Sequence, residues 1–531
     1  MTDETETFKM GKYLNPGNTE FEEALNSEIY VDKTGLIEYT NKVLRTQQKY
    51  ICVSRPRRFG KSMAANMLAA YYSSECDSKA MFSSLKISES DSFEKHLNRY
   101  DVIRINMQEF LNKSGNTEQM TDLISKAVGR DIFRKYPDVD YFDKSVLSYV
   151  LDDVFSEYNI SFVIIIDEWD CVLRDSRIDS DEQKKYLDFL CDLFKDQRYV
   201  ALGYMTGILP IKKYGKHSAI NVFYEYSMTD ADPIAEFTGF TEQEVKDICE
   251  KYGKSFSEMK RWYDGYCVNG ISIYNPKSVV ESVIRGNFNN YWTSTETYEA
   301  LKVYIEMNFD GLKDTITKLL AGQKAVIDTT TFTNDMVTFS SKDDVLTLLI
   351  HLGYLTYDFN TKEVSIPNYE ISEQYASTIR VMGWSEVEKS LKISEELLKA
   401  TLECNENRVA ELIEQAHQDN TSILKYNDEN SLSCVLSLAY YSARKTYTIE
   451  RELPAGKGYA DLVFRPRDNN SNPAVIIELK YGHSTEEALE QIKKYQYSDC
   501  LKGYSGEVLL VGINYDKKTK KHSCGIEKMK I

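Results

Sequence analysis

The sequence predicts an α/β protein with a parallel sheet covered by helices, a helical middle and a smaller α/β domain near the C-terminal end. Three observations support this fold class. Continuous apolar runs of strand length alternate with helical patterns in roughly the first 235 residues, which is typical of a parallel sheet buried on both faces. From about Phe240 the pattern becomes helical. Near the end, two apolar runs flank a segment rich in Asn, Asp and Pro and precede a capped helix.

Composition sets the class of protein. The chain has 531 residues, too many for one core, so about two to four domains are expected. Its 42% hydrophobic and 28% charged content is ordinary for a globular protein. No apolar run has membrane-spanning length, and the acidic start Met1–Glu6 is unlike a signal peptide. The ten cysteines form no C-x-x-C pair, so a reduced, cytoplasmic protein without a zinc site or disulfide framework is expected.

Charge is unevenly distributed along the chain. The net charge is −17, and residues 441–531 hold 16 Lys and Arg against 12 Asp and Glu, or +4, which leaves −17 − 4 = −21 for the rest. The C-terminal part is therefore the one plausible phosphate-facing surface. An unevenly charged surface without a partner explains the same numbers equally well.

The elements follow in order along the first part of the chain. Strands are predicted at Lys49–Ser54, Asp101–Ile105, Phe162–Ile166 and Val200–Met205. The Ala-, Met- and Leu-rich stretch Met63–Tyr72 is predicted to be a helix. The expected domains are residues 1–235, 236–420 and 421–531.

The middle of the chain has the outline of a winged-helix module at about residues 330–375. Asp343–Leu352 is predicted to be a helix, followed by short strands at Gly353–Tyr357 and Glu363–Ile366. Further helices are expected from Trp384 to about Gln418, before a polar break at Asp419–Thr421.

The segment Arg55-Pro56-Arg57-Arg58-Phe59-Gly60-Lys61-Ser62 lies between a predicted strand and a predicted helix. That context is what a phosphate-binding loop requires, although Arg55 stands where the first Gly of G-x-x-x-x-G-K-[ST] usually is. Backbone N–H groups at the helix start would face the phosphates of ATP. Lys61 would pair with the β- and γ-phosphates and Ser62 would hold Mg²⁺. The predicted nucleotide-binding set also includes Arg57, Arg58 and Gly60.

A second acidic motif strengthens the nucleotide interpretation. The apolar run ending at Ile166 leads into Asp167 and Glu168. Asp167 would bind Mg²⁺ through water, and Glu168 would polarise the attacking water. Thr206-Gly207, after another strand, could sense the γ-phosphate. The alternative is that these residues are surface acids and a polar strand end.

A carboxylate–lysine pattern lies near the C-terminus. Tyr459–Phe464 and Val475–Lys480 are predicted to be neighbouring strands. Glu478 and Lys480 share a face because strand side chains alternate, and Asp461 can meet Glu478 across a shared divalent ion. Such an ion would lower the pKa of a bound water and stabilise a charged transition state.

The flanking residues extend this pattern. Ser484 and Glu487 fit a capping box that starts a helix. Gln491 and Tyr495 share a face of that helix. Upstream, Glu429 could supply a third carboxylate. A solvated ion-pair face is the alternative for Glu-x-Lys alone, but the full order with its strand–turn–strand–helix context favours a catalytic site.

The chain resembles two known families. Its N-terminal two-thirds is similar to a bacterial family of AAA-ATPase-like proteins, which implies a P-loop NTPase sheet. Its last hundred residues resemble the PD-(D/E)XK nuclease superfamily in the RecB-like style, with a restriction-endonuclease-like fold. By this resemblance Glu429, Asp461, Glu478 and Lys480 take metal and catalytic roles, and Gln491 and Tyr495 supporting ones. The motifs that carry the resemblance are Tyr30–Thr34, Arg55–Ser62, Ile166–Glu168, Trp262–Tyr266, Tyr274–Pro276, Gly458–Asp461, Glu478–Lys480 and Gln491-x-x-x-Tyr495.

Trp262–Tyr266 allows two interpretations. It could contact nucleotide or close a lid over the ATPase site. Aromatic-rich segments with Asp-Gly are more often packed turns, and we expect a packed turn here.

The predicted function is an ATP-regulated, Mg²⁺-dependent nuclease, that is, an ATPase and phosphodiesterase with ATP and Mg²⁺ as cofactors. DNA is favoured over RNA as the substrate, and no membrane partner is expected. One rival hypothesis is a nucleotide-dependent signalling switch whose terminal domain binds nucleic acid or protein without cleavage. Another is a scaffold in which neither site works. The sequence leaves open whether ATP is hydrolysed and whether the chain forms a homo-oligomer.

Overall fold

The computed structural model describes most of the chain. The described residues are 11–211, 220–230, 233–292, 298–307, 309, 311–333, 336, 339–382, 385–420, 429–455, 458–467, 472–495, 501, 504–516 and 518–530. The chain divides into two compact units. Unit 1 holds Met1–Trp292 and Val326–Ile371, and unit 2 holds Thr293–Ala325 and Ser372–Ile531.

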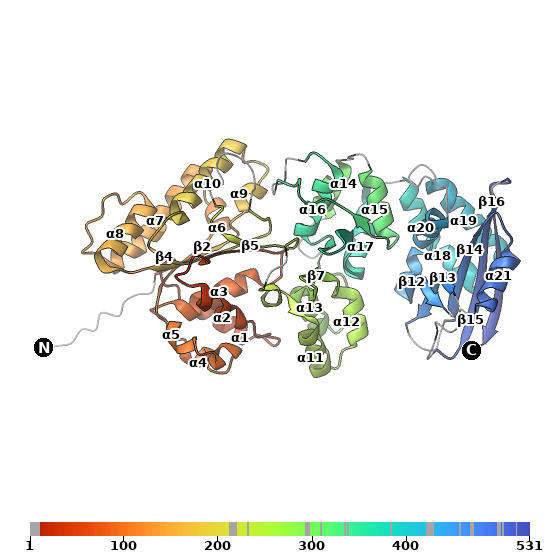
Figure 1. Cartoon of the computed structure of the whole chain (residues 1–531), viewed down its shortest axis with the longest axis horizontal. Coiled ribbons are helices and arrows are strands. Elements are labelled where there is room, and N and C mark those ends of the chain that lie inside the picture. The colour runs from red at the N-terminus through yellow and green to blue at the C-terminus, as the bar shows by residue number, and fades with distance from the viewer. Residues whose placement is uncertain are drawn as a thin grey trace. The chain divides into compact units, whose positions relative to one another are not determined.

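The core of unit 1 is a parallel sheet with the strand order β2-β3-β4-β1-β5. All residues of β1, β3 and β4 are buried, so the predicted two-faced burial is confirmed. Figure 1 shows α1 to α5 on one face of this sheet and α6 to α10 on the other. The strands are β1 (Tyr50–Ser54), β2 (Asp101–Asn106), β3 (Phe162–Asp167), β4 (Val200–Gly207) and β5 (Tyr224–Tyr226).

The helices on the first face include α3 (Lys61–Tyr72), which follows the predicted phosphate loop. Its Ala-rich inner side packs into the core with β1 and β4 residues. The others on this face are α1 (Thr19–Leu25), α2 (Gly35–Val43), α4 (Lys79–Phe82), the 3₁₀ turn η1 (Lys86–Glu89) and α5 (Phe93–His96). The second face has α6 (Met107–Leu111), α7 (Thr117–Lys135), α8 (Leu147–Tyr158), α9 (Cys171–Arg174) and α10 (Ser180–Phe194).

Unit 1 continues with a small sheet of order β6-β8-β7, which the sequence analysis did not predict. Thr241 and Glu244 form a reciprocal capping box at the start of α11. Asn275 caps α13, and Pro276 occupies its first turn. The elements are η2 (Ala235–Phe237), β6 (Phe240–Thr241), α11 (Glu242–Tyr252), α12 (Phe256–Tyr263), β7 (Tyr266–Val268), β8 (Ile271–Tyr274) and α13 (Pro276–Arg285).

The second segment of unit 1 contains a helix followed by a hairpin. α16 (Lys342–Leu352) precedes β10 (Thr356–Asp358) and β11 (Glu363–Ser365), which pair antiparallel, so the predicted helix and hairpin are confirmed, and the winged-helix module stays a prediction. Their sheet has the order β10-β11-β9, with β9 at Ala325–Val326. The first predicted strand begins too early, because Gly353 at φ 87° ends α16 rather than starting β10.

Unit 2 contains a mixed sheet of order β12-β13-β14-β15-β16, in which β14 and β15 are parallel and the other pairs antiparallel. Its strands are β12 (Tyr447–Ala455), β13 (Gly458–Pro466), β14 (Ala474–Tyr481), β15 (Glu507–Asp516) and β16 (Lys521–Lys530). Its helices are α14 (Tyr298–Glu306), α15 (Leu312–Leu320), α18 (Ser385–Leu402), α19 (Glu406–Asn420), α20 (Glu429–Ala439), the 3₁₀ turn η3 (Tyr441–Lys445) and α21 (Thr485–Lys494). α17 (Tyr369–Met382) begins in unit 1 and continues into unit 2.

Two boundaries fall partly outside the described residues. The predicted polar break reaches Thr421, and α19 runs to Asn420, where the description stops. The predicted turn from Arg465 to Pro473 includes residues 468–471, which are also outside the description. None of the described helices combines the length and the hydropathy that crossing a bilayer requires.

Candidate functional sites

The predicted phosphate loop joins the end of β1 to the start of α3. Gly60 is the N-cap of α3 and has φ 84°, a left-handed conformation that glycine adopts without strain. The buried Lys61 ammonium donates to the carbonyl oxygens of Arg55 and Pro56, both at 2.9 Å. Burial lowers the pKa of Lys61, against the opposing pull of nearby carboxylates. Ser62 is exposed at the first turn of α3, where a bound ligand could reach it.

The arginines of the loop have different positions. Arg57 is exposed, and Arg58 is half-buried with a left-handed φ of 68°. Arg55 is only 1% exposed and donates to the carbonyls of Ser54, at 3.1 Å, and Tyr226, at 2.9 Å. Arg55 therefore ties the loop to β5, which explains why an arginine occupies the position of the usual glycine.

Replacing Arg55 by glycine is expected to destabilise unit 1 rather than improve the loop. The change removes charge-assisted hydrogen bonds to two buried carbonyls, which costs about 2–3 kcal/mol. Thermal unfolding of the full chain should show a lowered midpoint, with no gain in nucleotide affinity. An unchanged midpoint would contradict the anchoring role.

The acidic motif at the end of β3 lies in a network of hydrogen bonds. Asp167 is 1% exposed and accepts a hydrogen bond from the Thr206 hydroxyl at the end of β4. Glu168 forms an ion pair with Arg174 and has φ 55°, an unusual conformation for a residue with a side chain. Asp170 is buried, accepts from the backbone N–H of Ile208 at 3.0 Å and also pairs with Arg174. Thr206 thus contacts the acidic motif, and a role in sensing γ-phosphate stays a prediction.

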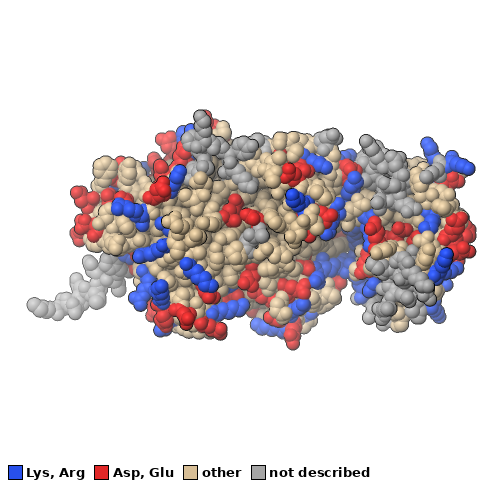
Figure 2. Space-filling model, in the orientation of Figure 1, with Lys and Arg blue, Asp and Glu red and all other residues tan. Residues whose placement is uncertain are grey.

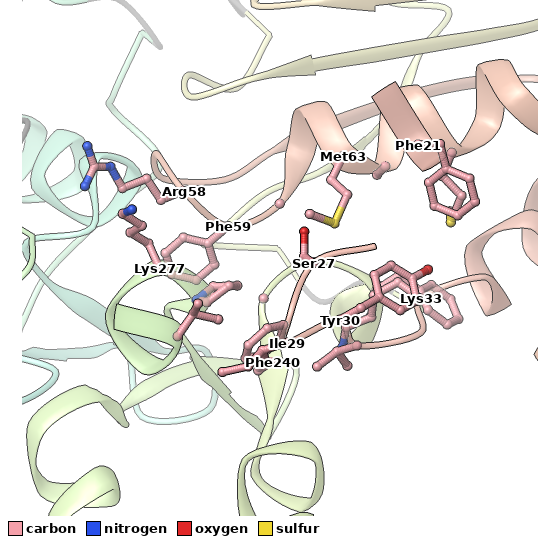
Figure 3. A pocket seen from close by; sticks show the side chains of 18 residues that line it. Phe21, Ser27, Ile29, Tyr30, Lys33, Arg58, Phe59, Met63, Phe240 and Lys277 are labelled. Carbon is pink, nitrogen blue, oxygen red and sulfur yellow. The ribbon is translucent and has the colours of Figure 1, made fainter. Parts of the chain in front are cut away.

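A cavity of about 400 Å³ opens beside the loop. This volume is within the range of small-molecule sites. Figure 3 shows Arg58 and Lys277 at one side of it, with Tyr30 and Phe240 facing the α3 residue Met63. Its lining is mainly apolar and includes Phe21, Ile29, Tyr30, Val31, Phe59, Met63, Ala64, Met67, Phe237, Phe240, Pro276 and Val280.

This cavity was not predicted from the sequence, although Tyr30–Thr34, three residues of which line it, is one of the motifs of the resemblance. The motif is held by Asp32, which accepts hydrogen bonds from Thr34 N at 2.8 Å and Lys86 N at 2.7 Å. Lys33 pairs with Glu244 at 2.6 Å, and both side chains are largely buried. The cavity therefore has a rigid wall built by residues far apart in sequence.

Trp262–Tyr266 is packed, as expected, but it spans the end of α12, the link Asp264-Gly265 and the first residue of β7 rather than a turn alone. Tyr263 and Tyr266 are buried, and their hydroxyls donate to the carbonyls of Asn289, at 2.9 Å, and Gly353, at 2.7 Å. Gly265 has φ 109°, and a Cβ there would lie 1.8 Å from the carbonyl oxygen of Pro367. The segment does not line the cavity beside the phosphate loop.

The carboxylate–lysine residues meet on neighbouring strands of unit 2. Leu462 and Ile477 are register partners of β13 and β14, so the next step places Asp461 across from Glu478. The Leu479 N–H donates to Asp461 Oδ2 at 2.8 Å, which confirms that these strand ends approach. Glu478 is 3% exposed and lies 2.9 Å from Lys480 Nζ.

Helix α21 adds to this cluster. Ser484 caps it by accepting from Glu487 N at 3.2 Å. Gln491 donates its side-chain amide to Glu478 Oε1, the same oxygen that pairs with Lys480. Tyr495 follows the last turn and packs against the apolar core of this domain. Glu429 is the first residue of α20, and its side chain is not among those that the structure describes.

The donor set suits a hard divalent cation. Asp461 and Glu478 are carboxylates on adjacent strands, and carboxylate oxygens with waters are the ligands that Mg²⁺ prefers. Among the side chains that the structure describes, no group of three or more His, Cys, Asp or Glu is placed to hold a metal. The described residues thus offer two carboxylates that could hold a cation. Their role as ligands, and that of Glu429 as a third, stays a prediction.

Comparisons with known proteins match two stretches of the chain. The family described as Predicted AAA-ATPase matches residues 17–215, and the PD-(D/E)XK nuclease superfamily matches residues 427–523. A curated relative, the uncharacterized protein in the vnfD 5′ region of Azotobacter chroococcum mcd 1, is 23% identical over 279 residues, or 50% of this chain and 51% of that protein. The match thus spans about half the length of that relative.

Two solved structures are similar in part. A Walker-type ATPase of Pyrococcus abyssi is 12% identical, with a TM-score of 0.35, and the match covers 65% of this chain and 94% of that chain. The ORC2 protein of Aeropyrum pernix, in ADPNP–ADP complexes, is 13% identical, with a TM-score of 0.30, covering 68% of this chain and 98% of that chain. The family matches and the fold together identify this chain as an AAA-ATPase-like domain followed, after a helical middle, by a PD-(D/E)XK nuclease superfamily domain.

Proposed function

We propose that the chain binds and hydrolyses ATP in its N-terminal domain and cleaves nucleic acid, DNA in preference to RNA, in its C-terminal domain with Mg²⁺. The observation that carries the nuclease half is the cluster in which Glu478 contacts both Lys480 and Gln491 and lies across from Asp461. We further propose the functional boundaries 1–235, 236–420 and 421–531. In this division the middle segment connects the two sites.

The residues of the nuclease site have separate roles in this proposal. Asp461 and Glu478 hold the divalent ion, which supplies an activated water and stabilises charge on the phosphate. Lys480 neutralises charge that develops on the scissile phosphate, since its side chain is 17% exposed and can be reached by substrate. Gln491 orients Glu478 through its hydrogen bond.

At the nucleotide site, Lys61 exchanges its two carbonyl partners for the phosphates of ATP, and Gly60 lets the backbone N–H groups at the start of α3 face them. Ser62 and Asp167 hold Mg²⁺, and Glu168 polarises the attacking water. Arg57 and Arg58 contribute positive charge. The cavity beside Gly60 receives the nucleobase, since it is apolar and lies next to the loop.

The proposal is tested by a paired assay on the full chain. Release of phosphate from ATP and Mg²⁺-dependent loss of a labelled DNA are both expected. Activity in neither assay would reject the proposed function. Nucleotide-dependent association with nucleic acid or protein, without cleavage, would favour the signalling switch.

A substitution in the cavity tests the proposed position of the nucleobase. Ala64 is buried in α3 and lines the cavity, so Ala64→Leu places three further carbon atoms where the base would lie. ATP affinity should fall about 5- to 150-fold, because overpacking a filled site typically costs about 1–3 kcal/mol. Binding of tripolyphosphate, which has no base, should be unchanged in the same titration. Equal losses for both ligands would place the base elsewhere.

Figure 2 bears on the nucleic-acid partner. On the drawn face of unit 2, Lys and Arg side chains are interspersed with Asp and Glu rather than gathered in one basic area. Phosphate contacts to the drawn Lys and Arg side chains of this face would therefore be few.

A further inference from the structure

A buried carboxylate in unit 1 belongs to neither candidate site. Glu370, in the first turn of α17, is 1% exposed. Its carboxylate accepts hydrogen bonds from the Ser278 hydroxyl, at 3.0 and 2.9 Å, and from the backbone N–H groups of Tyr291, at 2.7 Å, and Trp292, at 2.9 Å. Its carbonyl oxygen accepts from the Asn290 side chain at 3.3 Å. Burying a carboxylate is costly, so such a complete set of donors calls for an explanation.

Three partners of Glu370, namely Asn290, Tyr291 and Trp292, lie where the chain leaves unit 1. The chain passes into unit 2 after Trp292 and again after Ile371. The carboxylate of Glu370 therefore ties one exit segment, residues 290–292, to the start of the other, α17. These partners are separated from it by 78 and 79 positions in sequence, so the junction depends on the fold.

The same carboxylate is linked to the nucleotide site through two elements. Ser278 is in the first turn of α13, and its neighbours Pro276 and Lys277 line the cavity beside the phosphate loop. Arg58 of the loop also lines that cavity, and its guanidinium donates to the Tyr291 carbonyl at 3.5 Å. Arg58 is thus in contact with the segment that Glu370 holds.

Among the described residues, the charged and titratable groups that face Glu370 include Arg58, Tyr263 and Tyr291. Burial raises the pKa of Glu370 to about 7, although the donated hydrogen bonds and the positive charge of Arg58 oppose the shift. Burial also raises the pKa of the two tyrosines, which are therefore neutral near pH 7. Of the groups named here, only Glu370 and Arg58 can therefore carry charge near neutral pH.

We propose that Glu370 and Arg58 form a relay through which occupation of the nucleotide site changes how the two exit segments are held. The relay rests on the proposed binding of ATP.

The phosphates of ATP attract Arg58, because an ionic hydrogen bond to phosphate is stronger than the long hydrogen bond from Arg58 to the Tyr291 carbonyl. With Arg58 withdrawn, Glu370 loses its stabilising positive charge and takes up a proton from solvent. The protonated carboxyl accepts less strongly from the N–H groups of Tyr291 and Trp292, so residues 290–292 are released. Glu370 therefore acts as a positioning residue for residues 290–292.

The test compares the full-length wild type with Glu370→Gln and Ser278→Ala. ATP–Mg²⁺ affinity is measured between pH 6 and 8, and hydrogen exchange of the Tyr291 and Trp292 amides is measured with and without ATP. In the wild type, affinity should rise as pH falls, by up to about tenfold per pH unit, since binding takes up at most one proton. ATP should also accelerate exchange of the two amides.

Glu370→Gln should abolish both responses, because glutamine does not titrate. Ser278→Ala removes a hydrogen bond that lowers the pKa of Glu370 and keeps the carboxyl, so it should lower stability and keep a pH-dependent affinity, with the profile shifted to higher pH. If Glu370→Gln keeps the pH profile or the ATP-induced exchange, the relay is wrong. Wild-type ATP binding without any change at Tyr291 and Trp292 would also overturn the relay alone. No ATP binding by the wild type would overturn the proposed function and, with it, the relay.

Discussion

Asp461→Asn is expected to lower the rate of Mg²⁺-dependent DNA cleavage by more than about 100-fold, since even groups behind a metal ligand contribute about 10–100-fold. The asparagine oxygen can still accept from the Leu479 N–H, which now bonds to Asp461 at 2.8 Å, so the strand ends should stay together. What is lost is the negative charge that attracts the divalent ion. The measurement is the initial rate of cleavage of a labelled DNA at saturating Mg²⁺.

A matched control is Asp516→Asn. Asp516 ends β15 of the same sheet and accepts from the backbone N–H of Lys518 at 2.7 Å, in an exposed turn. Asp516→Asn removes one negative charge from the same domain, as Asp461→Asn does, and should leave the rate of cleavage unchanged. Lys480→Ala should lower the rate by about 10²–10³-fold, the usual cost of removing one group that stabilises transition-state charge. Full cleavage by both Asp461→Asn and Lys480→Ala would remove the site assignment.

Lys61→Ala is expected to weaken ATP binding by about 10- to 150-fold, because a hydrogen bond to a charged group contributes about 1.5–3 kcal/mol. In the structure the Lys61 ammonium bonds to the carbonyls of Arg55 and Pro56, each at 2.9 Å. It must leave these two oxygens to reach phosphate. The energy gained on binding is therefore a difference between two sets of bonds, and isothermal titration with ATP–Mg²⁺ measures it.

The control for this variant is Lys42→Ala. Lys42 is exposed on α2 and forms only a surface ion pair with Glu38, at 3.4 Å, so its removal should not alter ATP binding. If Lys61→Ala binds ATP as tightly as the wild type does, the loop is not a phosphate site. If neither the wild type nor Lys61→Ala binds ATP, the result would favour the scaffold hypothesis.

Much of the fold could be predicted because the strands are long, apolar and buried. The predicted runs ending at Ser54, Ile105, Ile166 and Met205 match β1 to β4 to within two residues. The small sheet of β6, β7 and β8 was missed, since strands of two to four residues have too few positions to show a period. Tertiary pairing, rather than local pattern, produces them.

The two sites differ in how far the sequence predicts them. Glu478 and Lys480 are two residues apart on one strand, so their contact follows from the alternation of side chains. The approach of Asp461 follows from one turn between two strands. Glu370 carries no local signal, because its partner Ser278 is 92 positions away. The role of Arg55 was equally hidden, since its bond to the Tyr226 carbonyl spans 171 positions.

The most direct test of the central claim is metal-dependent cleavage by the wild type and by Glu478→Gln, measured side by side. Each protein is incubated with single- and double-stranded DNA and RNA, with Mg²⁺ or with a chelator, and with or without ATP. The account predicts that the wild type cleaves at least one substrate, that the chelator stops cleavage, and that Glu478→Gln is inactive while still binding ATP. Equal cleavage by the two proteins, or cleavage that persists in chelator, would contradict it.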